Sequence, residues 1–115
     1  MTVYVDDLQD YGNLVRGYAR RYGTIWCHLS CGGDCEELHD MARRLGLRRS
    51  YAQHMDNPNH FFHHYDLIPS KRAQALRLDA VYQSIWDTAR MYERLTGHKF
   101  EDWEEEDSTE EIEID

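Results

Sequence analysis

The segment His60–Arg72, HFFHHYDLIPSKR, decides how the rest of the chain is interpreted. It contains three of the seven histidines, one carboxylate and a basic pair. An extended backbone over residues 61–67 alternates its side chains between two faces, which places His64 and Asp66 on the same face. The segment therefore predicts a strand that carries an imidazole and a carboxylate side by side.

The residues that follow predict the start of a helix. Pro69 stops the strand, and Ser70 is the expected N-cap of a helix over residues 71–78 that opens with Lys71 and Arg72. A helix N-terminus beside two cations favours an anion such as phosphate. A carboxylate near an imidazole fixes its tautomer, so the strand would supply an acid/base pair next to this anion site. The alternative interpretation is a surface loop whose polar side chains are only solvated.

The first residues, Thr2–Asp7, alternate in polarity and predict a half-buried strand. Tyr4 and Asp6 would share one face of it. Acids at the carboxyl end of a strand often line sites in α/β proteins, so both side chains are candidate ligand-binding groups. The alternative for Asp6 is a residue that merely opens a turn.

A second strand is predicted at Thr24–Ser30. Its apolar side chains share one face, which we expect to pack on the core: Ile25, Cys27 and Leu29. The opposite face would carry Trp26, which could stack a base, and His28, which could carry a proton. Another part of the chain could equally cover this face.

A helix is predicted at Cys35–Leu45, with Asp34 as its capping residue and Gly46 as its stop. His39 lies near the edge of its apolar stripe and is a candidate second proton carrier. A lone histidine on a helix is more often a surface residue or a satisfied core group.

The remaining elements complete a small α/β fold. Leu47–Gln53 predicts a third strand, with Gln53 as a candidate ligand-binding residue, and residues 80–83 predict a short last strand. Ser84 is the expected cap of the last helix, while residues 8–23 predict a short helix or an ordered loop. The sequence thus predicts one sheet of about four to five short strands with about three to four helices.

The acidity of the chain is concentrated at its end. Residues 101–115 hold ten of the 22 acidic residues and no lysine or arginine. Residues 1–100 then carry 12 acidic and 13 basic residues, a net charge of +1. We therefore expect one nearly neutral domain over residues 1–100 and an acidic, disordered tail over residues 101–115. The tail could also imitate nucleic acid or shield a basic site.

The three cysteines are Cys27, Cys31 and Cys35. Their odd number, in a chain expected in the cytosol, argues against a disulfide framework. Together with His28 they could hold a metal ion, although zinc sites more often contain cysteine pairs two residues apart.

Several short motifs occur in a recognisable order and spacing. The motifs are VYVDD at residues 3–7, WCHL at 26–29, ELH at 37–39 with ARRLGL at 42–47, HYDL at 64–67 and SKRAQA at 70–75. They resemble the bacterial and phage family called domain of unknown function 4031, over most of residues 1–90. The resemblance implies a small α/β protein and supplies no reaction. Residues 9–23 are longer than the family's usual loop, and the acidic tail is an addition. Because phages carry many members, the resemblance implies a role in phage–host conflict, such as anti-defence.

Three functions are compatible with these residues, and whether the protein is an enzyme stays open. The first is hydrolysis of a nucleotide or phosphodiester. Its candidate catalytic residues are His64, Asp66, His28 and His39, and its candidate ligand-binding residues are Trp26, Gln53, Arg72, Lys71, Tyr4 and Asp6. In a variant of this mechanism, the histidines and Asp6 or Asp66 hold a divalent metal such as zinc.

The second function is a binding module that sequesters a nucleotide-like signal without chemistry. The third is an interaction protein whose acidic tail engages a basic host partner.

The sequence also excludes several function classes. No stretch approaches the roughly 20 apolar residues of a membrane span. No basic-then-apolar signal segment opens the chain, which favours the cytoplasm, or the host cytosol for a phage protein. No basic recognition helix stands out, so sequence-specific DNA binding is not expected. The oligomeric state stays open.

Overall fold

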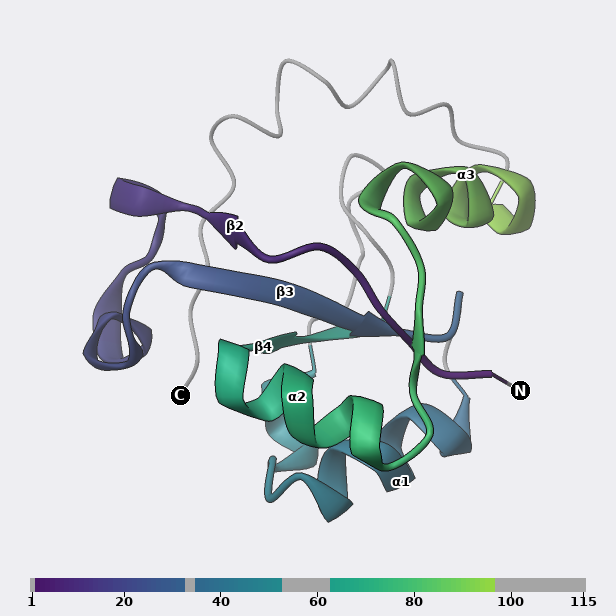
Figure 1. The fold of residues 1–115 in the computed structure, drawn as a ribbon, viewed down its shortest axis with the longest axis horizontal. Helices are drawn as coiled ribbons and strands as arrows, with labels where there is room; N and C mark the ends of the chain where they lie inside the picture. The colour runs from purple at the N-terminus through teal and green to yellow at the C-terminus, as the bar shows by residue number, and fades with distance from the viewer. Residues whose placement is uncertain (1, 33–34, 53–62, 97–115) are drawn as a thin grey trace.

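The computed structural model describes residues 2–32, 35–52 and 63–96 of the chain. Over these ranges the protein forms a mixed five-stranded sheet with three α-helices (Figure 1). The expected α/β class and the expected number of elements are therefore confirmed. The elements are β1 (Tyr4–Val5), β2 (Gln9–Asp10), η1 (Gly12–Leu14), η2 (Gly17–Tyr22), β3 (Ile25–Ser30), α1 (Glu36–Arg44), η3 (Arg49–Tyr51), β4 (His64–Leu67), α2 (Pro69–Arg77), β5 (Val81–Tyr82) and α3 (Ile85–Thr96), where η marks a 3-10 helix.

Strand β3 is the central element of the sheet, as its position in Figure 1 shows. Along one edge it pairs antiparallel with β2 and then with β1, where Val5 lies opposite Leu29. Along the other edge it pairs antiparallel with β4, where His28 lies opposite Asp66. Strand β5 extends the sheet by pairing parallel with β1. Residues near both ends of the described chain thus meet in one sheet.

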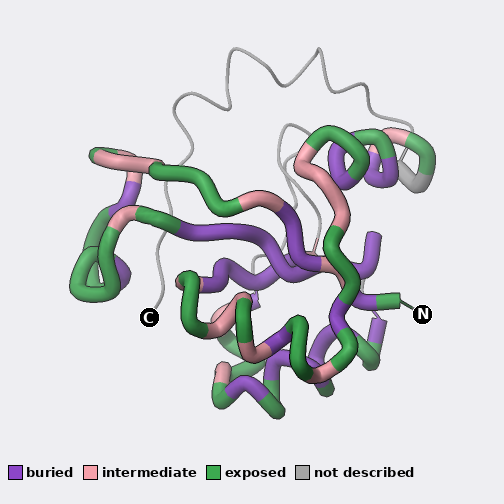
Figure 2. The backbone as a smooth tube through the Cα atoms, viewed as in Figure 1, coloured by how far each residue is buried: buried purple, intermediate pink, exposed green. Residues whose placement is uncertain are grey.

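The two faces of the sheet carry different side chains. Helices α1 and α2 lie on one face, and α3 lies on the other (Figure 1). The main core fills the first face, and its members from the strands alternate along each strand: Val3, Val5, Cys27, Leu29, Tyr65 and Leu67. Ile25 was expected to pack on this core with Cys27 and Leu29, and this part of the prediction is wrong, since Ile25 is 45% exposed at the first position of β3. Figure 2 shows β3 and β4 as largely buried, with the outer sides of α1 and α2 exposed.

Among the described residues, two small clusters pack on the second face. Helix α3 packs Ala89, Met91 and Tyr92 against Tyr4 at one end. The 3-10 helix η2 and the segment before it pack Val15 and Ala19 against the indole of Trp26 at the other end. The polar side chains of β3 and β4 lie on this face, because they alternate with the core residues.

Helices α1 and α2 lie close to their expected positions, but their first residues differ. Cys35 is the N-cap of α1, and the expected cap Asp34 lies outside the described residues. Ser70 was expected to cap α2, and this prediction is wrong, since Ile68 is the N-cap and Pro69 is the first helical residue. Proline suits that position because its φ angle is already helical and its missing N–H needs no partner there.

The strand predicted at Leu47–Gln53 is not formed over its described part. Residues Arg49–Tyr51 instead form the 3-10 helix η3, closed by a hydrogen bond from the Tyr51 N–H to the Arg48 carbonyl of 2.9 Å. Gly46 ends the preceding helix with a φ of +83°, which turns the chain back along α1 rather than toward the sheet. Gln53 lies outside the described residues.

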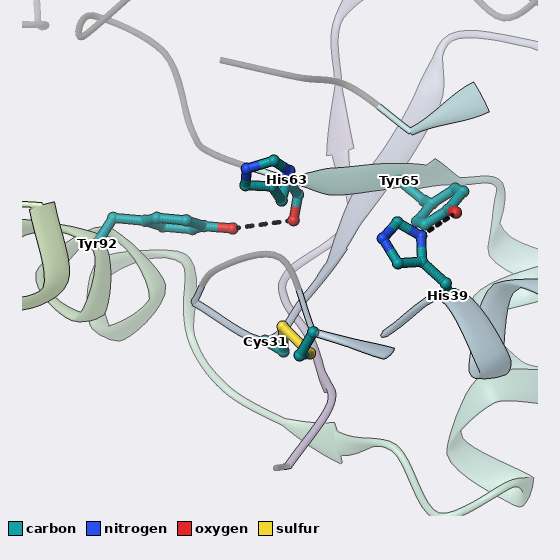
Figure 3. The surroundings of a disulfide bond; sticks show 6 residues. Cys31, His39, His63, Tyr65 and Tyr92 are labelled. Atoms are coloured by element: carbon teal, nitrogen blue, oxygen red, sulfur yellow. Dashed lines mark hydrogen bonds between the residues drawn. A yellow bond between two sulfur atoms is a disulfide. The ribbon is translucent and has the colours of Figure 1, made fainter. Parts of the chain in front are cut away.

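The cysteines also differ from the prediction. Cys31 and Cys35 form a disulfide that links the end of β3 to the N-cap of α1 (Figure 3). Cys27 is buried in the main core, where desolvation raises the pKa of its thiol. It faces away from His28, since neighbouring residues of a strand point to opposite faces. The alternative of a metal site made from the three cysteines and His28 is therefore wrong.

Asp7 fastens α3 to the edge of the sheet. Its carboxylate accepts hydrogen bonds from the Tyr82 hydroxyl at 2.7 Å and from the Ile85 N–H at 3.0 Å. The side chain of Ser84 adds a cap by accepting the Asp87 N–H at 3.1 Å, as the sequence predicted. The bond from Tyr82, followed by that from Ile85, holds the pKa of Asp7 below its ordinary value of 3.8.

This arrangement predicts a pH dependence of stability. A carboxylate with a lowered folded-state pKa stabilises the fold above its unfolded pKa, near 4, and loses this contribution as the pH falls through the folded value. We expect Asp7→Asn to lower the free energy of unfolding at pH 6 by at most about 1 kcal/mol, since the carboxylate is largely solvent-screened. Urea titrations at pH 6 and pH 3 should show this difference shrinking at the lower pH. An equal difference at both values would contradict the role given to the Asp7 charge.

The acidic segment 101–115 lies outside the described residues. Within the described ranges, no helix has the length and apolar character needed to cross a bilayer.

Candidate metal centre and adjoining cleft

Three neighbouring strands bring polar side chains into one row on the second face of the sheet. His28 on β3 lies directly opposite Asp66 on β4. On the other side of β3, the Asp6 N–H just beyond β1 donates to the His28 carbonyl at 3.2 Å. Residues that lie opposite one another across strands share a face, so the row runs Asp6, His28, Asp66. His64 lies on the same face as Asp66, two residues before it, as the sequence predicted.

Asp6 holds the imidazole of His28 in place through its Nδ1 atom. Its Oδ2 lies 2.7 Å from His28 Nδ1, and its Oδ1 accepts the His28 backbone N–H at 2.6 Å. A ring that donates Nδ1–H to a carboxylate carries its lone pair on Nε2. This carboxylate–imidazole pairing is the arrangement that orients histidine ligands in metal sites.

Three side chains could together hold a metal ion and form the candidate metal-binding group: His28, His64 and Asp66. Each offers one ligand atom, and these atoms all lie within 4.8 Å of one another. His64 Nε2 lies 3.6 Å from Asp66 Oδ1, which is too long for a hydrogen bond. A tetrahedral zinc ion with bonds of about 2.0–2.2 Å sets its ligand atoms about 3.3–3.6 Å apart. Side-chain shifts of about 1 Å would therefore bring all three atoms to ligand distance.

The side chains of this group and of Asp6 are almost completely buried, which favours binding of a cation. The side chains of His28, His64, Asp66 and Asp6 are exposed by 7%, 2%, 4% and 1% respectively. A buried carboxylate is costly to keep charged unless a cation or hydrogen-bond donors compensate for the lost water. A divalent cation held by the two imidazoles and the carboxylate of Asp66 would provide this compensation.

The group lies between the two clusters that cover the second face. The ring of His28 contacts the ring of His64 edge-on, with 4.9 Å between centroids. Tyr11 approaches the other side of His28, with 6.4 Å between centroids. Tyr4, a candidate ligand-binding residue, packs on α3 two positions before Asp6 and is not a member of the group.

Arg72 was expected to bind phosphate, and the structure gives it a different set of contacts. Its Nε donates to the carbonyl of Asp6 at 2.9 Å, and its guanidinium lies 5.8 Å from the centroid of the Tyr82 ring. Arg72 belongs to α2, which lies on the face of the sheet opposite the imidazoles of His28 and His64. Arg72 thus positions the backbone that carries Asp6, and the structure does not bring it to the metal-binding group.

His39 is likewise separated from the group. Its Nδ1 lies 2.7 Å from the hydroxyl of Tyr65, with which it forms a buried pair between α1 and β4 (Figure 3). Tyr65 points into the main core, whereas its neighbours His64 and Asp66 point to the other face. The sequence predicted that His39 would act together with His28 and His64, but His39 lies on the opposite face of the sheet from them. His39 is the satisfied core group that the sequence left as the alternative.

A cleft of about 200 Å³ adjoins the group at the carboxyl end of β4. Aromatic side chains from three segments line it, and Asp66 forms part of its wall. The full lining is Tyr18, Tyr22, Trp26, Gly46, Leu47, Tyr51, Asp66, Ile68 and Lys71. Asp66 therefore belongs both to the metal-binding group and to the cleft.

Two of the predicted ligand-binding residues lie at this cleft. Lys71 donates from Nζ to the carbonyl of Leu45 at 2.7 Å, which places its charge at the wall. Trp26 is 2% exposed, and its Nε1–H donates to the Gly23 carbonyl at 3.0 Å. Trp26 is thus a core side chain with one edge at the cleft, and the expected exposed stacking platform is not formed by it.

The sequence missed the tyrosines that line this cleft. Tyr18 and Tyr22 are four residues apart, which fits the apolar stripe of an ordinary helix. Their segment forms the 3-10 helix η2 instead, and both side chains are about half exposed. Their spacing next to several arginines was the only signal that could have marked them as surface aromatic residues.

Comparison with known proteins supports a family assignment. No curated protein and no solved structure matches the chain significantly. One family model, described as a protein of unknown function (DUF4031), matches residues 3–95, a span that contains every described residue of the metal-binding group and the cleft. The chain therefore belongs to the DUF4031 family.

Proposed function

We propose that this protein is a hydrolase of a nucleotide or another phosphate ester, and that it acts with one divalent metal ion bound by His28, His64 and Asp66. The observation that carries the proposal is the placement of these three ligand atoms within 4.8 Å of one another, with Asp6 behind His28. Two imidazoles and one carboxylate are a usual ligand set for zinc and for other divalent ions of the first transition row.

The ligand set leaves room for chemistry. Within residues 2–32, 35–52 and 63–96, the group offers three protein ligands, one fewer than the four of a structural zinc site. When bound by these residues, a divalent ion would supply a water of lowered pKa and would polarise a phosphate oxygen. The cleft next to Asp66 offers a place for the rest of the substrate, and Lys71 at its wall can balance the charge of a phosphate group.

Each polar residue then has a distinct task. His28, His64 and Asp66 hold the ion, and the bond from Asp6 keeps His28 in one tautomer and one orientation. Arg72 fixes the backbone of Asp6 through its carbonyl. The sequence placed an acid/base pair at His64 and Asp66. In this mechanism both residues would hold the ion, so that neither would act as the acid or the base.

The experiment is a metal-dependent hydrolysis assay. The purified full chain is stripped with a chelator, divided, and reconstituted with zinc, manganese or magnesium. Each sample is given nucleoside monophosphates, diphosphates, triphosphates and dinucleotides, and the products are separated by chromatography. We expect product only in reconstituted samples, with saturable kinetics. Failure of every metal to yield product from any of these substrates would contradict the proposal.

The same assay separates catalysis from sequestration. A nucleotide that copurifies or binds with metal and is recovered unchanged after denaturation would indicate a binding module. That result would refute hydrolysis while leaving the metal-binding group in place.

A further inference from the structure

We infer that the cleft between η2 and the start of α2 binds the base of a nucleotide, so that the substrate of the proposed reaction carries an aromatic ring together with its phosphate. This inference rests on the proposed function for the position of the phosphate, but the binding of the ring depends only on the cleft. It names the substrate class, which the metal-binding group alone leaves open.

The cleft has the side chains that planar ligands need. Tyr18, Tyr22 and Tyr51 supply aromatic surface from two separate 3-10 helices. Tyr18 and Tyr22 are 50% and 49% exposed, although large aromatic side chains are costly to leave in water without a partner. Aromatic platforms of this kind bind bases by stacking, because every base presents a flat face.

The tyrosine pair is held in place before any ligand arrives. The rings of Tyr18 and Tyr22 lie 5.8 Å apart at an angle of 59°, and the guanidinium of Arg21 lies 5.0 Å from the Tyr18 centroid. A hydrogen bond from Tyr22, followed by the effect of Arg21, lowers the pKa of Tyr18. Preorganised aromatic groups lose little conformational entropy on binding.

The size of the cleft limits what it can hold. Pockets for drug-sized ligands usually measure about 300–1,000 Å³. A cavity of about 200 Å³ suits one ring system rather than a whole nucleotide or a peptide side chain with its backbone. The sugar and phosphate would then lie outside the aromatic part of the cleft.

Asp66 and Lys71 determine where the phosphate lies. Asp66 lines the cleft and is also a member of the metal-binding group. Because Asp66 and the tyrosines line the same cleft, a base against the tyrosines would leave its phosphate on the side of Asp66. Lys71 holds a positive charge at the same wall through its bond to the Leu45 carbonyl, which complements the phosphate. The charges at this end of the cleft thus match a nucleotide better than an uncharged aromatic compound.

The test measures binding without turnover. Calorimetric titrations use the metal-free full chain and three probes: adenosine 5′-monophosphate, adenosine, and ribose 5-phosphate. We expect the two compounds with a base to bind at least tenfold more tightly than ribose 5-phosphate. Equal affinity of all three probes, or no binding of any, would overturn the inference.

Variants locate the binding to the cleft. The double variant Tyr18→Ala/Tyr22→Ala should weaken adenosine monophosphate binding about 10- to 100-fold, because one stacked base is lost. Zinc affinity should stay unchanged, since neither tyrosine belongs to the metal-binding group. Trp86→Ala is the matched control, because Trp86 is 62% exposed on α3 and lies outside the cleft. Unchanged nucleotide affinity in the double variant, or an equal loss in the control, would refute the assignment.

The two proposals fail in different ways. Binding of the base without any metal-dependent product would refute the hydrolase and preserve the cleft assignment. Metal-dependent hydrolysis of phosphate esters that lack a base, as fast as of nucleotides, would preserve the hydrolase and refute the cleft assignment.

Discussion

His64→Gln is expected to abolish metal-dependent turnover and to weaken zinc binding by at least 100-fold. Glutamine has a volume close to that of histidine, and so it fills the buried position while removing the imidazole ligand. His64 is 2% exposed at the edge of the sheet's second face, where its ring contacts that of His28. The fold should persist, as circular dichroism would show, because the main core lies on the other face.

Two further variants test whether the loss of zinc affinity depends on the position of the substituted residue. Asp6→Asn keeps an oxygen for the His28 backbone N–H but removes the carboxylate from His28 Nδ1. We expect it to reduce zinc affinity about 10- to 100-fold, the usual effect of losing such a supporting carboxylate. His39→Gln is the control, because His39 pairs with Tyr65 on the opposite face and should leave zinc affinity unchanged. Full activity of His64→Gln, or an equal loss in His39→Gln, would refute the assignment of the ligands.

The second large effect concerns the core. Leu29→Ala should reduce the free energy of unfolding by about 3–5 kcal/mol, the range for a leucine removed from a closely packed core. Leu29 is fully buried on the central strand, paired with Val5 on one side and Tyr65 on the other. Because small domains are stabilised by only about 5–15 kcal/mol, this single change removes a large share.

Ile25→Ala provides the matched control on the same strand. Ile25 is 45% exposed at the beginning of β3, so we expect its loss to cost less than about 1 kcal/mol. Urea denaturation followed by tryptophan fluorescence measures both variants. A cost for Leu29→Ala no larger than for Ile25→Ala would show that β3 does not form the centre of the core.

The alternation of polar and apolar residues along β3 and β4 allowed the faces of the candidate site residues to be predicted. A polar side chain between two core residues must face away from the core, so the sequence correctly placed His28 on one face of β3 and His64 with Asp66 on one face of β4. It could not determine which strands lie side by side. The pairing of β3 with β1 brings Asp6 to His28, and its pairing with β4 places Asp66 opposite His28. No local pattern encodes either register.

The errors arise where tertiary contacts outweigh local signals. His39 has the polarity of a site residue, yet a buried tyrosine hydroxyl satisfies it within the core. Leu47–Gln53 alternates like a strand, but Gly46 turns the chain along α1 before it can reach the sheet. Tyr18 and Tyr22 fit a helical stripe, yet their segment winds as a 3-10 helix and leaves both exposed.

The most direct test of the metal centre is native mass spectrometry of the full chain after zinc reconstitution and removal of excess metal. We predict the mass of one zinc ion on the wild-type protein, none on His64→Gln, and one on His39→Gln. A wild-type chain that stays bare after zinc exposure, or a His64→Gln chain that holds zinc as firmly as the wild type, would contradict a metal centre at His28, His64 and Asp66.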